Sequence, residues 1–168
     1  MDFFNQGIIG RIRRNHALEH ATLQVLASRK KYPMLAGYSD WRGFWVMGDI
    51  QTEDLLSAAE DALKRLNAGE SSLAIHPHCG TNFAVSGLLA GSAAWVVMTG
   101  AGNGWKKKLE RFPLVVTVVT LVLILAQPLG PMAQRKITTC PTPDGLKISA
   151  IHLQPFRNTT AHRVLTIG

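Results

Sequence analysis

Residues 15–20 read NHALEH and place two histidines and a glutamate at spacings that suit metal chemistry. On a helix, His16 and His20 leave from one face about one turn apart, and Glu19 lies near the same face. Two imidazoles at this spacing can clamp a metal ion, and a carboxylate beside them can activate a metal-bound water, as in zinc-protease motifs. The same letters also fit ordinary polar residues on an amphipathic helix, so both interpretations stand on this segment alone.

A second group of candidate ligands occurs at residues 76–79, which read HPHC. It supplies His76, His78 and Cys79, and a catalytic zinc usually needs three protein ligands and one open position. With His16 and His20, the two short segments hold four of the six histidines and one of the two cysteines. This clustering favours metal binding over two unrelated polar segments.

The elements that must position these residues are predicted from periodicity. Residues 3–30 have apolar residues at helical spacing and predict an amphipathic helix. Residues 34–49 alternate turn residues with aromatic and β-branched ones, which predicts a short β-hairpin with its turn near residues 39–40 or 42–43. Residues 52–70 predict a second helix, with Thr52 as its N-cap and Gly69 at its end.

Two uncharged apolar runs follow, at about 83–100 and 112–132. Each is long enough to cross a bilayer, where a helix satisfies its own backbone hydrogen bonds. The short basic segment between them predicts a transmembrane helical hairpin with both terminal regions on one side of the membrane. We expect no cleavable signal peptide and both termini in the cytoplasm, with the protein in a bacterial inner membrane.

Together these elements predict an α+β membrane protein of three parts. Residues 1–82 form a juxtamembrane α+β domain with the metal site, residues 83–134 form the hairpin, and residues 135–168 form a C-terminal tail with strand character. The net charge is +7, and the lysines and arginines flank apolar stretches. That distribution favours the lipid bilayer as a partner, and no nucleic-acid-binding motif is visible.

The combination of NHALEHATLQVL with HPHCGTNF directly before an apolar helix resembles the YqhQ-type family of bacterial membrane proteins, predicted metal-dependent enzymes. The motifs match at His16, Glu19 and His20, and then at the HPxCGT segment beginning with His76. The chain also resembles small uncharacterised membrane proteins of cyanobacteria and green non-sulfur bacteria that share both motifs. It departs from the YqhQ-type pattern in its short length, its two spans and its unplaced C-terminal tail.

The resemblance implies a metal site made by His16, His20, His76 and Cys79, and zinc suits this mixture of imidazole and thiolate. If all four bind, the site is closed and structural. If only one of His76 and Cys79 binds, a water can occupy the fourth position and Glu19 can act as its base. The sequence therefore predicts a zinc-dependent hydrolase or, alternatively, a non-catalytic subunit or assembly factor of a larger membrane complex. A peripheral lipid-binding protein without metal is a third hypothesis.

Overall fold

The computed structural model describes residues 5–29, 32, 35–102, 104–156 and 159–168. The chain divides into two compact units. The first, here called the α/β unit, comprises Met1–His76 and Arg135–Gly168, and the second, the apolar unit, comprises Pro77–Gln134. The mixed α+β architecture predicted from the sequence is confirmed.

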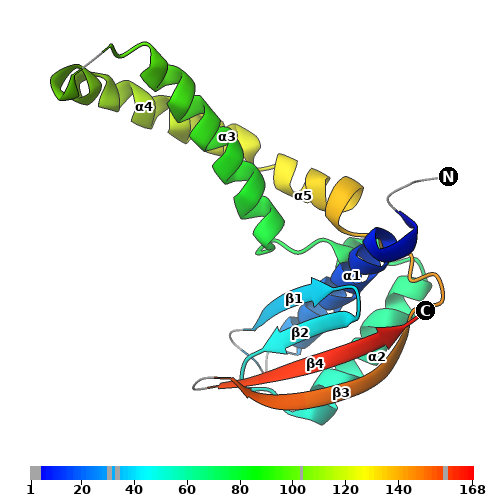
Figure 1. The fold of residues 1–168 in the computed structure, drawn as a ribbon. Helices are drawn as coiled ribbons and strands as arrows, with labels where there is room; N and C mark the ends of the chain where they lie inside the picture. The colour runs from blue at the N-terminus through cyan, green and yellow to red at the C-terminus, as the bar shows by residue number, and fades with distance from the viewer. Residues whose placement is uncertain (1–4, 30–31, 33–34, 103, 157–158) are drawn as a thin grey trace. The chain divides into compact units, whose positions relative to one another are not determined.

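The α/β unit packs two helices on one face of a four-stranded antiparallel sheet (Figure 1). The strand order is β1-β2-β4-β3. The helices are α1 (Gly7–Ser28) and α2 (Thr52–Asn67), and the strands are β1 (Ala36–Asp40), β2 (Gly43–Met47), β3 (Lys147–Phe156) and β4 (Thr159–Ile167). Short helical turns η2 (Ser71–Ala74) and η3 (Gln134–Thr138) flank the apolar unit in sequence.

The core of this unit lies between the sheet and the two helices. Successive residues of a strand point to opposite faces, and β2 accordingly buries Phe44 and Val46 fully. Small residues of α2, including Ala58 and Ala62, are also fully buried and allow that helix to approach α1 closely. The buried apolar side chains of α1 and β4 complete the core: Ala17, Leu18, Ala21, Leu23, Val25, Leu26 and Val164.

The segment expected as a C-terminal tail supplies half of the sheet. Its residues form β3 and β4, and β4 pairs antiparallel with β2 from Gly43↔Leu165 to Met47↔Ala161. The strand character of the tail was predictable, whereas its pairing with a hairpin more than 100 residues earlier was not. Because of this pairing, the chain returns to the α/β unit after the apolar unit.

The apolar unit contains α3 (Gly80–Thr99), α4 (Trp105–Ala126) and the short α5 (Leu129–Ala133). Both α3 and α4 are long and apolar enough to cross a membrane. The second helix differs from the predicted 112–132: it begins at Trp105, so the basic residues Lys106–Lys108 lie in its first turn, and it ends before Pro128. A hydrogen bond joins the first turn of α3 to the end of α5: the Gln134 side-chain amide donates to Asn82 Oδ1 at 2.6 Å.

Candidate functional site

Helix α1 brings His16 and His20 together, as their spacing predicts. The centroids of the two rings are 4.2 Å apart and the rings meet edge to face. A potential ligand atom of one lies within 4.8 Å of a potential ligand atom of the other. His20 is buried and His16 is half-buried, so the two imidazoles sit at the margin of the core rather than on an open helix face.

Backbone carbonyls fix both rings. Nδ1 of His20 lies 2.8 Å from the carbonyl oxygen of Ala74, and Nδ1 of His16 lies 3.0 Å from that of Thr138. A carbonyl only accepts hydrogen bonds, so Nδ1 of each neutral ring carries the proton and donates it. Nε2 is then the nitrogen that keeps its lone pair, which is the tautomer that a metal ligand needs.

His76 follows η2 and joins the same cluster. Its ring centroid lies 5.5 Å from that of His20. His20 is therefore the ring that is close to both of the others, His16 and His76. The structure thus brings together, within the α/β unit, all three histidines predicted as ligands.

Cys79 lies near the start of the apolar unit and is the N-cap of α3. Its sulfur accepts a hydrogen bond from the Thr81 backbone N–H at 3.4 Å, and the residue is buried. Because it lies only three positions after His76, the two Cα atoms are within about 11 Å of each other whatever the conformation of the chain between them. The covalent chain alone therefore keeps Cys79 near His76.

Glu19 is buried on α1, and its carboxylate is engaged by β1. The Ser39 hydroxyl donates a short hydrogen bond to Glu19 Oε2. A side chain at Gly37 would collide with the same carboxylate, since a Cβ there would lie 2.1 Å from Oε1. The sequence predicts Glu19 as a base for a metal-bound water, and the structure adds that this carboxylate ties α1 to β1.

Arg13 holds the segment whose Thr138 carbonyl accepts the hydrogen bond from His16. Its buried guanidinium donates to the carbonyl oxygens of Lys136 at 3.0 Å and Thr139 at 2.9 Å, on either side of Thr138. The backbone N–H of Cys140 in turn donates to the Arg13 carbonyl. Arg13 is thus a positioning residue for His16, and its place three residues before His16 is the only sequence signal of that role.

A family comparison covers all of these residues. The family model described as "Domain of unknown function (DUF6391)" matches residues 11–151. The chain belongs to the DUF6391 family. An uncharacterized protein of the cyanobacterium Picosynechococcus sp. is 39% identical over 141 residues, which cover 76% of this chain and 65% of that relative. The chain thus spans a little less than two thirds of the relative's length. No solved structure matches the chain.

The DUF6391 match contains the five residues predicted for the site, as well as both apolar helices. It describes no reaction and no ligand, so the metal site and the resemblance to YqhQ-type proteins stay predictions.

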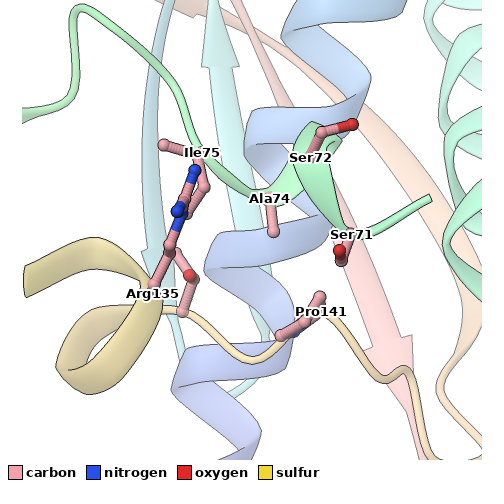
Figure 2. Close-up of a pocket in the computed structure, with 7 residues that line it drawn as sticks. Ser71, Ser72, Ala74, Ile75, Arg135 and Pro141 are labelled. Carbon is pink, nitrogen blue, oxygen red and sulfur yellow. The ribbon is translucent and has the colours of Figure 1, made fainter. Parts of the chain in front are cut away.

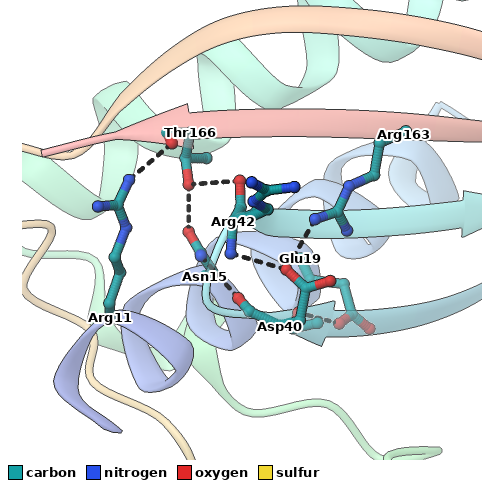
Figure 3. Close-up of polar contacts among 8 residues, drawn as sticks. Arg11, Asn15, Glu19, Asp40, Arg42, Arg163 and Thr166 are labelled. Atoms are coloured by element: carbon teal, nitrogen blue, oxygen red, sulfur yellow. Dashed lines mark hydrogen bonds and ion pairs between the residues drawn. The ribbon is translucent and has the colours of Figure 1, made fainter. Parts of the chain in front are cut away.

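A second polar network that the sequence did not indicate joins α1 to the sheet near the site (Figure 3). The Thr166 hydroxyl donates to Asn15 Oδ1 at 2.7 Å, and the Asn15 amide donates to the Asp40 carbonyl at 2.8 Å. The Asp40 carboxylate accepts from Arg163 at 2.7 Å. Burial acts to raise the pKa of Asp40, but the hydrogen bond and charge of Arg163, together with backbone hydrogen bonds from Arg42 and Gly43, lower this pKa below its usual value. Asp40 is therefore an ionised anchor for β4, and the network holds α1 in place against the sheet.

Proposed function

We propose that this chain is a membrane-anchored protein that binds a zinc ion through His16, His20 and one or both of His76 and Cys79. The observation that carries the proposal is the pair of Nδ1 hydrogen bonds to the Ala74 and Thr138 carbonyls. Histidines that bind metals nearly always donate their other ring N–H in this way.

The donor set fits zinc better than a hard cation. The ligands predicted from the sequence are imidazole and thiolate groups, and this mixture is typical of zinc sites. Calcium and magnesium take oxygen ligands, which this group lacks. If only one of His76 and Cys79 binds, three protein ligands leave one position open, and if both bind, the site is closed.

Membrane anchoring is supported by α3 and α4. Only 6% of the apolar window of each helix is buried within the protein, so most of these residues leave apolar surface that needs another apolar environment. We place the two helices across a bacterial inner membrane as a hairpin, with both termini in the cytoplasm. Lipid is then the main partner of the apolar unit.

A hydrolytic role follows if the fourth position is open. A bound zinc would lower the pKa of a water there, and Glu19 would accept its proton. The alternative is a structural zinc in a non-catalytic subunit of a larger membrane complex. The contact that favours this alternative is the hydrogen bond from Ser39 to Glu19, which gives that carboxylate a role in packing.

The test is elemental analysis of the full chain purified in mild detergent. We expect about one zinc per chain, as for any mononuclear site. His16→Ala and Cys79→Ser should each lower the zinc content severalfold. His152→Ala, which removes an exposed histidine of β3, is the matched control and should change nothing. Zinc-free wild-type protein that is fully folded would overturn the proposal.

Glu19→Gln separates the two forms of the proposal. Glutamine keeps the shape of the side chain and can still accept from Ser39, so the zinc content should be retained. If the site is catalytic, hydrolysis of a mixed pool of membrane-protein substrates should fall at least about a hundredfold, as on removal of a general base. If the wild type hydrolyses nothing, and a chelator lowers its unfolding temperature, the zinc is structural.

A further inference from the structure

A pocket of about 380 Å³ opens in the α/β unit beside the candidate metal ligands. Figure 2 shows Arg135 and Ile75 on one side of it, and Ser71 and Pro141 on the other. Its volume lies within the range of small-ligand sites. None of the sequence motifs points to it, because its walls come from two segments that are about 60 residues apart along the chain.

These walls are the two segments that fix the histidines. Ala74 lines the pocket, and its carbonyl accepts the hydrogen bond from His20. Thr139 also lines it and directly follows Thr138, whose carbonyl accepts from His16. A ligand in the pocket would therefore contact the two backbone segments whose carbonyls orient the imidazoles of His16 and His20.

The lining has the chemistry of a phosphate site. Arg135 contributes an exposed guanidinium, and Ser71 and Ser72 contribute hydroxyl groups. None of the described residues that line the pocket is acidic. A guanidinium donates two parallel hydrogen bonds to a phosphate, and hydroxyls can serve its remaining oxygens. Ala74 and Pro141 add apolar surface for the carbon skeleton of a phosphate ester.

We propose that this pocket binds the phosphate group of a phosphate ester, with Arg135 as the main contact. Two sources share this chemistry: a phospholipid headgroup and a soluble phosphate ester. Ser71–Ala74 precedes the apolar unit by a few residues, and Arg135 directly follows it. The lipid source therefore rests on the proposed membrane anchoring, whereas phosphate binding itself requires neither the membrane nor the metal.

The test is calorimetric titration of the full chain in neutral detergent, with glycerol 1-phosphate and short-chain phosphatidylglycerol as probes and glycerol as the phosphate-free control. Arg135→Gln should weaken binding of a phosphate probe at least about tenfold, the effect of losing a charged hydrogen bond. Lys136→Gln is the matched control, because it removes the same charge from the next exposed position outside the pocket lining. Its binding should stay within about twofold of the wild type, as for a surface charge that only contributes to the general field.

The outcomes separate the sources and the proposals. Tighter binding of phosphatidylglycerol identifies a lipid site, and tighter binding of glycerol 1-phosphate identifies a soluble ester; either supports the pocket. Equal weakening by Arg135→Gln and Lys136→Gln, or no binding of either probe, overturns it. Ser72→Phe, which fills the pocket from an exposed position, should also abolish binding. Zinc content measured on the same samples reports on the metal site separately, and Arg135→Gln should leave it unchanged.

Discussion

At the scale of single residues, His162 is a pH-sensitive position of the α/β unit. It is fully buried on β4, where Nε2 pairs with the Thr52 hydroxyl at 3.0 Å and Nδ1 has no hydrogen-bond partner among the described residues. Burial lowers the pKa of His162, and the nearby charge of Glu53 opposes this only in part. The unfolded chain, with an ordinary histidine pKa of about 6.5, therefore binds this proton more readily than the folded chain does.

Stability should consequently fall as the pH drops below about 6.5, because protonation of His162 favours the unfolded state. We expect His162→Gln to flatten the decline of the unfolding temperature between about pH 7.5 and 5. Circular dichroism of the detergent-purified chain measures this, with His152→Gln on the exposed side of β3 as the control. An unchanged pH slope in His162→Gln would contradict the prediction.

Residue spacing predicted the histidine pair but not what orients it. An i, i+4 pair on a helix is a local property, and the 4.2 Å between the ring centroids of His16 and His20 follows from it. The carbonyls of Ala74 and Thr138 lie 54 and 122 residues away in sequence, and every residue has a carbonyl, so no side-chain pattern marks them. The contact of Glu19 with Ser39 was hidden as well, because it joins two elements through residues that are 20 positions apart in the chain.

At the scale of elements, the close pairing of β2 with β4 depends on Gly43. Its φ is +145°, and a Cβ there would lie 2.0 Å from the carbonyl oxygen of Val164. Gly43→Ala must therefore separate the strands at this register position, and we expect it to lower the free energy of unfolding by about 2 kcal/mol or more.

Chemical denaturation compares Gly43→Ala with Gly87→Ala, whose added Cβ on α3 would meet nothing within 4 Å. The control should be neutral or slightly stabilising, as expected for glycine replaced inside a helix. If both variants unfold like the wild type, the register that pairs Gly43 with Leu165 is wrong.

Local elements were predicted better than their ends and partners. Both helices of the α/β unit and the hairpin occur where periodicity placed them, and the hairpin turns at residues 41–42, between Asp40 and Gly43. The prediction of Thr52 as an N-cap was wrong, because Gln51 is the N-cap and the Thr52 hydroxyl pairs with His162 instead. A partner that lies 110 residues away outcompeted the local cap, which sequence spacing cannot reveal.

At the scale of the whole molecule, the apolar unit is an insertion within the α/β unit. The residues before it and after it pair in one sheet, so the chain enters and leaves the apolar unit on the same side of any membrane it crosses. That requires an even number of crossings, and the described residues contain two helices suited to make them. The pairing of β2 with β4 and the presence of α3 and α4 are thus both consistent with a chain that crosses a membrane twice.

This arrangement, combined with the proposed cytoplasmic location of both termini, predicts the labelling pattern of single cysteines in bacterial cells that express the full chain. A membrane-impermeant maleimide should label Trp105→Cys, at the start of α4 next to the segment that joins the two spans, in intact spheroplasts. Glu60→Cys on α2 and Lys147→Cys on β3, both exposed positions, should react only after permeabilisation. The unsubstituted chain, whose Cys79 and Cys140 are buried, provides the background. The reverse pattern would place both termini outside the cytoplasm, whereas labelling of all three positions from one side would rule out the spanning hairpin.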